Sequence, residues 1–259
     1  MGGVSHLNGY ATGKPWKIEK ERHILEAAFQ LFSQRGIEAV TVPEIAEASG
    51  VGRATVFRYF TTKLELVVAV GAWKWEEYIE TYKATLPLER IERMTGAEWL
   101  QFFLDSFLNL YRNHPDILRF NYSFNSYLSY AAATASQKQL YTHMVEELEQ
   151  QFHALYVRGT QDGTLRTDIT EEVMFSSSFH IMLAAVTRYA MGLVYVPEQG
   201  TNPEQELIML KQLLLCKFTT FLLAQREEIQ KKYSDGQAFP GAMVAFNPPE
   251  ADFSSIVHQ

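Results

Sequence analysis

The chain has 259 residues and is 47% hydrophobic, 20% charged and 13% aromatic, a composition typical of a globular protein with a sizeable core. Its single Cys excludes a disulfide framework and a multi-cysteine metal site, and it favours a reducing, cytoplasmic setting. No apolar run is long enough for a membrane span, and Met1–Pro15 lacks the apolar core of a signal peptide. The net charge of −7, taken over the whole chain, argues against binding to nucleic acid.

The charge is unevenly distributed along the chain. Residues 1–65 contain eight Lys or Arg and seven Glu, a balance of +1, whereas the remaining 194 residues carry −8. The stretch 51–63 contains Arg53, Arg58 and Lys63 and no acidic residue. This pattern predicts a small anion-binding surface at one end of an otherwise acidic protein.

Hydrophobic periodicity predicts an all-α fold of about nine helices, because segments of alternating polar and apolar residues are missing. The turns between the helices are marked by Gly and Pro, as at Gly36, Pro87 and Pro115, and a Gly- and Pro-containing tail follows residue 234. The expected helices cover 19–34, 41–48, 53–60, 63–85, 98–113, 116–130, 136–158, 171–193 and 204–232.

The second and third expected helices meet the physical requirements of a helix-turn-helix. Thr41 and Glu44 form a capping box at the start of the second helix, and Gly50 supplies the sharp turn before the third. Val56 and Phe60 would fix the third helix to the core, which leaves one face outward. The outward or nearly outward residues are Arg53, Ala54, Thr55, Phe57, Arg58 and Tyr59.

A helix with this face fits the major groove of DNA. An Arg side chain can donate two hydrogen bonds to guanine there, and because Arg58 points outward, Arg58→Ala is expected to relax base preference at one position. Thr41 and Lys63 flank the helix, at places where phosphate contacts would set its register. For Phe57 and Tyr59, packing within the protein is the alternative to contact with DNA.

About 50 residues of this region resemble the DNA-binding domain of the tetracycline-repressor (TetR) family. A second, looser resemblance is the segment Gly159–Asp168, which is similar to the loop that many members carry before their penultimate helix. Gly52 departs from the pattern, because members usually have Ser or Thr at this cap, and Gly costs a few tenths of a kcal/mol there. The matching residues are Ile24–Ala28, Leu31, Phe32, Gly36, Thr41, Ile45, Ala46, Gly50, Val51, Ala54–Phe60, Lys63 and Leu66.

The resemblance implies a homodimer that binds a palindromic operator and responds to a small molecule. It places the residues corresponding to Thr41, Arg53, Thr55, Phe57, Tyr59 and Lys63 at the DNA interface. The last two helices, 171–193 and 203–232, would form the dimer interface, and Leu214→Glu would test it. The expected domains are an N-terminal arm (1–16), a DNA-binding domain (17–64), a ligand-binding and dimerisation domain (65–233) and an irregular tail (234–259).

The effector pocket is expected in the C-terminal helices, where the stretch 120–127 mixes aromatic rings with amide and hydroxyl groups. Such a mixture suits a mostly apolar pocket with a few polar groups, and thus a small, mostly apolar effector. Core packing is the alternative for these residues, and a core or interface role is the alternative for His180. The candidate ligand-binding residues are Phe103, Phe107, Phe120, Asn121, Phe124, Tyr127 and His180.

Three other functions are weighed against this one. A helix-turn-helix protein controlled by a protein partner, without a small-molecule effector, remains open. An enzyme is disfavoured because the common catalytic and phosphate-binding motifs are missing, and no cofactor is expected. No metal site is expected, since His143 and Glu147 have no supporting pair, and no membrane contact is expected from an acidic body. Cys216 is expected to be a buried small hydrophobic residue.

Overall fold

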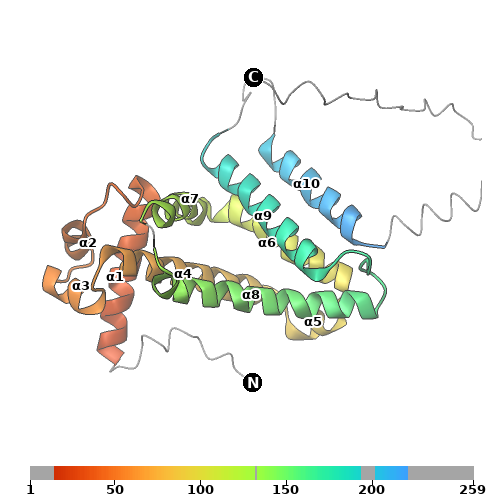
Figure 1. Ribbon diagram of the computed structural model, residues 1–259, viewed down its shortest axis with the longest axis horizontal. Helices are drawn as coiled ribbons and strands as arrows, with labels where there is room; N and C mark the ends of the chain where they lie inside the picture. Colours follow the sequence, from red (N-terminus) through yellow and green to blue (C-terminus); the bar gives the residue numbers. More distant parts are fainter. Residues whose placement is uncertain (1–14, 132, 194–201, 221–259) are drawn as a thin grey trace, which may run out of the picture. The chain divides into compact units, whose positions relative to one another are not determined.

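The computed structural model describes residues 15–131, 133–193 and 202–220, and the expected all-α fold is confirmed there (Figure 1). Most of the predicted N-terminal arm, the second half of the last predicted helix and the whole predicted tail lie outside these ranges. The helices are α1 (Pro15–Arg35), α2 (Val42–Ala48), α3 (Arg53–Tyr59), α4 (Lys63–Lys83), α5 (Leu88–Arg93), α6 (Gly96–Asn113), α7 (Pro115–Tyr130), α8 (Ala135–Gln161), α9 (Glu171–Ala190) and α10 (Pro203–Phe218).

The ten helices in the described ranges include one that the periodicity missed. This is α5, a six-residue helix that begins directly after Pro87. It has Glu89 in its first turn and Arg90 and Arg93 in its last, the arrangement that the helix dipole favours. It was missed because a helix this short has no hydrophobic period to detect.

The helices α6 and α8 begin two residues and one residue earlier than predicted, because each starts with a capping box. Thr95 accepts a hydrogen bond from the Glu98 backbone, while the Glu98 carboxylate accepts from the Thr95 N–H at 2.8 Å. Thr134 and Gln137 make the equivalent pair at the start of α8. These reciprocal bonds satisfy donors that would otherwise be unpaired at the helix ends.

Aromatic rings join the N-terminal helices to the rest of the molecule. On α1, Phe29 and Phe32 lie with their ring centroids 5.7 and 6.4 Å from that of Phe120 on α7. Phe120 in turn packs at 5.4 Å against Phe124. All four side chains are fully buried. The helix-turn-helix is therefore continuous with the core of the helices that follow it.

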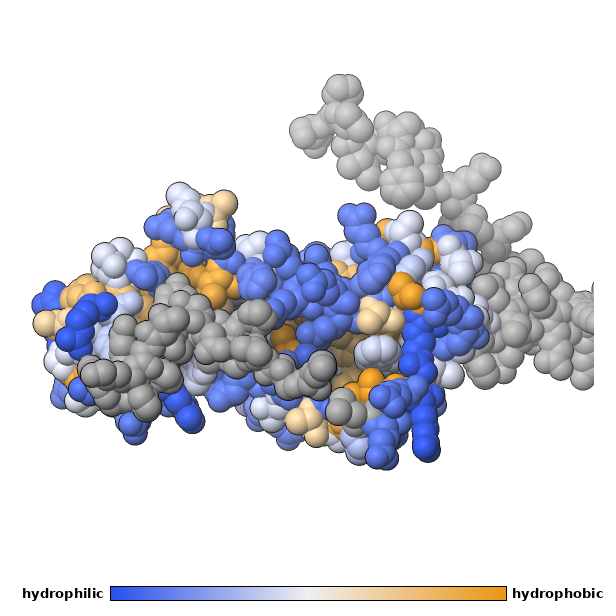
Figure 2. Space-filling view, turned by 90° about the horizontal axis from the view of Figure 1, so that it is seen from below, coloured by the Kyte–Doolittle hydropathy of each residue, from blue (hydrophilic) through white to orange (hydrophobic). Residues whose placement is uncertain are grey.

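Most large apolar side chains lie in this core, and the face of the molecule shown in Figure 2 is accordingly mostly hydrophilic, with small separate hydrophobic areas. None of the helices in the described ranges combines the length and the apolar character that a membrane crossing needs.

The Gly-containing segment that resembles a family loop has a structural role. Gly159 on α8 lies so close to Gly96 on α6 that a Cβ on Gly96 would be 2.1 Å from the Gly159 Cα. The Asp162 carboxylate accepts a hydrogen bond from the Gly96 N–H at 2.8 Å, and the Thr164 hydroxyl accepts one from the Ala97 N–H at 3.0 Å. The segment therefore caps α6 where α6 and α8 meet.

Candidate functional site

The candidate DNA-recognition element is the turn between α2 and α3, followed by α3, which we call the recognition helix. Gly50 has a φ of 68°, in the left-handed region that glycine enters without a Cβ penalty. Gly52 is the N-cap of α3, and on the inner side Val56 and Phe60 are buried. These anchors fix which face of α3 points outward.

The outward face of α3 carries two arginines. Arg53, Ala54, Phe57 and Arg58 are exposed, whereas Thr55 and Tyr59 are half-buried. The Arg53 guanidinium lies 5.5 Å from the Phe57 ring centroid, and that of Arg58 lies 5.7 Å from the Tyr59 ring centroid. Cation–π contacts of this kind orient a guanidinium while leaving its N–H donors available.

Phe57 is 40% exposed, which is unusual for a phenylalanine on a short helix. This large apolar side chain on the outward face can contact the methyl group of thymine in a major groove. The exposure argues against the alternative of core packing for Phe57, whereas the half-buried Tyr59 is compatible with either role.

Thr41 is engaged within the protein. Its backbone N–H and its hydroxyl both donate to Glu44 Oε2, each at 2.7 Å, and Glu44 also pairs with Arg35 at 2.8 Å. These hydrogen bonds, led by the one from the Thr41 hydroxyl, lower the pKa of Glu44 to about 2. The charged carboxylate thus holds the start of α2 against the end of α1, and the Thr41 hydroxyl has its proton directed to Glu44.

Lys63 lies at the junction of three elements. Its ammonium donates to the backbone carbonyl of Ile37 at 2.6 Å and lies 5.6 Å from the ring centroid of Tyr127 on α7. Partial burial lowers the pKa of Lys63 below its usual value. An ammonium has three donors, so the bond to Ile37 leaves capacity for a phosphate.

The predicted ligand-binding residues lie in different parts of the molecule. Phe120 packs against α1, as described above, Phe124 packs against Phe120 and against Tyr141 of α8, and Tyr127 lies against Lys63. Phe103 and Phe107 belong to a separate cluster with rings from α8 and α9. The structure therefore does not gather the predicted set around one pocket.

Asn121 has an unusual environment. Its side chain is 2% exposed, and its Oδ1 has no hydrogen-bond partner. A buried acceptor without a partner costs free energy. An unpaired polar atom at this position is compatible with the predicted ligand contact.

His180 lies on the outward face of α9, exposed together with Ile181, Ala184 and Arg188. On α10, Met209 and Leu213 are 60% and 61% exposed. Figure 1 shows α9 and α10 side by side. Each helix therefore has an outward face with exposed apolar residues.

Two expectations about α10 are wrong. Leu214 is buried in the protomer and Leu213 is the exposed neighbour, so Leu214→Glu would test folding rather than a dimer contact. Cys216, expected to be buried, is exposed, because it follows Leu213 by three residues and shares its face of the helix.

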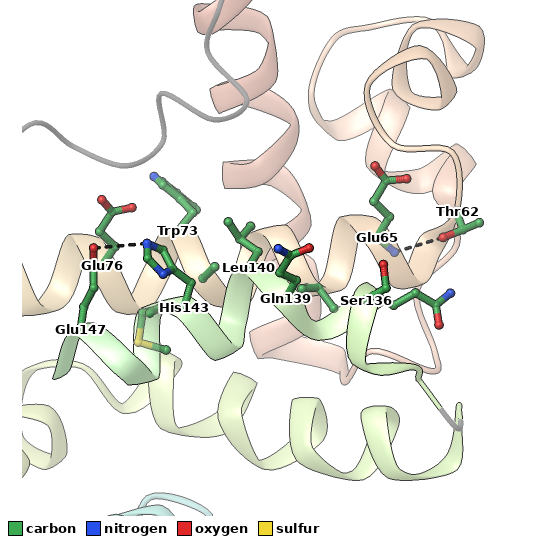
Figure 3. A pocket seen from close by; sticks show the side chains of 13 residues that line it. Thr62, Glu65, Trp73, Glu76, Ser136, Gln139, Leu140, His143 and Glu147 are labelled. Atoms are coloured by element: carbon green, nitrogen blue, oxygen red, sulfur yellow. Dashed lines mark hydrogen bonds and ion pairs between the residues drawn. The ribbon is translucent and has the colours of Figure 1, made fainter. Parts of the chain in front are cut away.

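A groove of about 770 Å³ lies between α4 and α8 (Figure 3). Glu76, His143 and Glu147 lie at one end and Glu65 lies toward the other, with Leu140 between them. The groove reaches Thr62, the N-cap of α4, three residues after the recognition helix ends. We call it the α4–α8 groove.

The sequence analysis did not predict this groove, although the spacing of its residues indicates two helix faces. On α4 and on α8 the groove residues recur every three or four positions, which places those of each helix on one face. The spacing does not show that the two faces are opposite one another, which only the packed structure reveals. The two sets are Glu65, Val68, Ala72 and Glu76 on α4, and Ser136, Leu140, His143 and Glu147 on α8.

The turn at Gly50, the anchored α3 and its cationic outward face define a class of protein, the helix-turn-helix DNA-binding transcriptional regulators. Comparison with known proteins leads to the same class. Residues 24–70 match the family model described as bacterial regulatory proteins, tetR family. The repressor KstR2 of Mycobacterium tuberculosis is 24% identical over 161 residues, which cover 59% of this chain and 72% of that protein.

Two solved structures share the fold. The regulator FadR of Bacillus subtilis, solved with stearoyl-CoA, has a TM-score of 0.57 at 18% identity and covers 75% of this chain and 97% of its own. A regulator from Saccharomonospora viridis, solved with choline, has a TM-score of 0.61 at 17% identity. The match covers 78% of this chain and 98% of that regulator. Residues 24–70 of the chain therefore form a DNA-binding domain of the TetR family, the domain shared by these transcriptional regulators. The protein is a DNA-binding regulator and not an enzyme.

Proposed function

We propose that the protein is a homodimeric repressor that binds a palindromic operator and is released by a small molecule. In this proposal residues 17–64 bind DNA, and residues 65–233 bind the effector and form the dimer. The main observation that supports this proposal is the outward face of α3. Two arginines and Phe57 are exposed there, on a helix whose inner residues are fixed in the core. Because its target is chromosomal DNA, the protein would work in the cytoplasm.

The DNA contacts that we propose divide into two kinds. Arg53, Ala54, Phe57 and Arg58 would face base edges in the major groove, since they are exposed on α3. Thr55, Tyr59, Lys63 and Thr41 would lie toward the phosphates at its edges. For Thr41 the hydroxyl proton is already directed to Glu44, so its contact with a phosphate would be made through a bridging water that donates to both.

The proposed dimer uses the outward faces of α9 and α10. The exposed apolar residues of these faces would be buried against a second copy, giving a four-helix interface. A two-fold dimer presents its two recognition helices symmetrically, which is why a palindromic site is expected.

Response to a small molecule is supported by structural neighbours with bound ligands. The two structural neighbours were solved with stearoyl-CoA and with choline. Because those ligands differ completely in size and charge, they do not identify the effector of this chain.

The test is fluorescence anisotropy of the protein on DNA from upstream of its own gene, at several salt concentrations. We expect tight, salt-sensitive binding that Arg53→Ala/Arg58→Ala abolishes. The matched control is Arg90→Ala/Arg93→Ala, which removes two exposed arginines from α5 and should bind like the wild type. Equal affinity for random DNA, or equal loss in the control, would contradict sequence-specific binding by α3.

A further inference from the structure

We propose that Arg53 and Phe57 read DNA together, and that each operator half-site contains a guanine and a thymine no more than two base steps apart. Phe57 would contact the thymine methyl group and would also hold the Arg53 guanidinium in place for the guanine. The inference rests on the proposed function, because it names the kind of DNA sequence that the outward face of α3 selects. Its basis is the contact between the two side chains and the exposure of both. We call them the Arg53–Phe57 pair.

The two side chains of the pair lie on the same side of the recognition helix. Arg53 and Phe57 are four residues apart, a spacing that makes side chains neighbours on a helix surface. Arg53 Cζ lies 5.5 Å from the centroid of the Phe57 ring, within the range of a cation–π contact. Both residues are exposed, so the pair presents an apolar surface and a fork of hydrogen-bond donors side by side.

The donors of the Arg53 guanidinium are not committed to another group of the protein. In the described part of the chain, the Arg53 side chain takes part in no ion pair or hydrogen bond, and its contact is with the Phe57 ring. A guanidinium that lies against a ring keeps its N–H donors at its edge. Those donors can therefore reach a base without breaking an ion pair first.

The chemistry of the two side chains selects the two bases. A guanidinium donates to both O6 and N7 of guanine in the major groove, whereas an apolar side chain contacts the C5 methyl group of thymine. Successive bases are about 3.4 Å apart along the DNA axis. Groups held 5.5 Å apart by their own contact therefore reach bases that are one or two steps apart.

Contact with the ring restricts the Arg53 guanidinium before DNA binds. A long side chain loses conformational entropy when it is fixed against a partner, and a contact that already restricts it lowers this cost. Removing the ring should therefore weaken the preference for guanine even though Arg53 is still present. Phe57 is in this respect a positioning residue for Arg53, in addition to its own contact with thymine.

Arg58 provides a comparison on the same helix. Its Cζ lies 5.7 Å from the ring centroid of Tyr59, which is adjacent in sequence and half-buried. Phe57 and Arg58 are successive residues, and successive side chains point about 100° apart around a helix. Arg58 should therefore read a base other than the two that the Arg53–Phe57 pair reads.

The test is selection by the full-length protein from a duplex pool with a random central segment of about 20 base pairs, two helical turns. We expect the wild type to enrich a guanine and a thymine one or two positions apart in each half of the site. Arg53→Ala should lose the guanine preference and keep the thymine preference. Phe57→Ala should lose the thymine preference and weaken the guanine preference. Arg58→Ala is the matched control, and it should keep both preferences and relax a different position.

Modified bases in the selected site separate the two roles of Phe57. Uracil lacks the methyl group of thymine, and its substitution should weaken wild-type binding about fourfold, the effect of one buried methyl group. The analogue 7-deazaguanine lacks the N7 acceptor, and its substitution should weaken binding at least about fivefold. Phe57→Leu, which stays apolar without a ring, should keep the uracil effect and reduce the 7-deazaguanine effect. Phe57→Tyr retains the ring and should restore the 7-deazaguanine effect.

The outcomes distinguish this inference from the proposed function. A selected guanine and thymine more than two steps apart, a guanine preference unchanged in Phe57→Ala, or equal 7-deazaguanine effects in Phe57→Leu and Phe57→Tyr would each overturn the inference. Each of these results would leave sequence-specific binding by the protein intact. A wild-type protein that enriches no sequence would overturn the proposed function, and the inference with it. Circular dichroism of each variant establishes that it is folded.

Discussion

At the scale of single residues, Lys63 has a contact that the sequence does not show. A lysine beside a recognition helix is expected to meet a phosphate, but its ammonium also donates to the Ile37 carbonyl and lies against Tyr127. It therefore ties the α1–α2 turn, the start of α4 and α7 together. A side chain with both roles should affect folding and DNA binding at once.

Lys63→Met, which keeps the aliphatic stem and removes the charge, should show both effects. We expect a loss of about 1 kcal/mol in the free energy of unfolding, from the bond to Ile37. The slope of log affinity against log salt should also fall by about one, from the lost phosphate contact. Urea denaturation and anisotropy at several salt concentrations measure the two. Lys83→Met, at the other end of α4, is the control, and an unchanged slope in Lys63→Met would contradict the phosphate contact.

Gly52 offers a gain-of-function substitution at the same scale. Its φ of −69° suits any residue, and no atom lies within 4 Å of the position that a Cβ would occupy there. Gly52→Ser should stabilise α3 by a few tenths of a kcal/mol through a hydroxyl cap. It should also tighten binding to all DNA sequences, because the hydroxyl lies where a phosphate would approach. Gly52→Ala is the control, and equal affinities for the Ser and Ala variants would show that the hydroxyl meets no phosphate.

At the scale of secondary-structure elements, local chemistry predicts much of what is observed. The first four expected helices and the turn at Gly50 follow from capping boxes, glycines and hydrophobic spacing, which act over a few residues. The starts of α6 and α8 were predicted two and one residues late, although Thr95 and Thr134 carried capping signals. The short α5 was missed because six residues give no usable period.

Close contact between elements depends on glycine at the junction of α6 and α8. A Cβ on Gly159 would lie 2.2 Å from Leu165 Cγ, and Leu165 is buried. We expect Gly159→Ala to lower the free energy of unfolding by about 1–3 kcal/mol, the usual cost of overpacking a core. At Gly71 the nearest atom, 2.9 Å away, belongs to the ring of Phe124, whose movement can relieve the contact. Gly71→Ala should therefore cost less, and an equal loss in the two variants by urea denaturation would contradict this ranking.

At the scale of the whole molecule, the exposed faces of α9 and α10 make a prediction about assembly. Leu213→Glu introduces a charge at an exposed apolar position, so it should leave the fold intact and convert dimers to monomers. Light scattering measures the mass, and thermal melting checks the fold. Tyr122→Glu, at a 49% exposed aromatic on α7, is the control and should remain dimeric. A dimeric Leu213→Glu protein would place the interface elsewhere.

The sequence alone determined the all-α fold and the helix-turn-helix. Both depend on interactions between residues close in the chain, namely caps, turns and one buried face per helix. For the same reason it predicted that Val56 and Phe60 are inside and that Arg53 and Arg58 are outside.

Only the tertiary structure decided what each helix face is packed against. It separated Phe103 and Phe107 from Phe120 and Phe124, turned His180 outward and exposed Leu213 in place of Leu214. It also brought one face of α4 and one face of α8 together as a groove. Hydrophobic periodicity predicts that one face of a helix is buried, but it does not identify the helices that bury it. Those helices come from distant parts of the chain, and packing selects them.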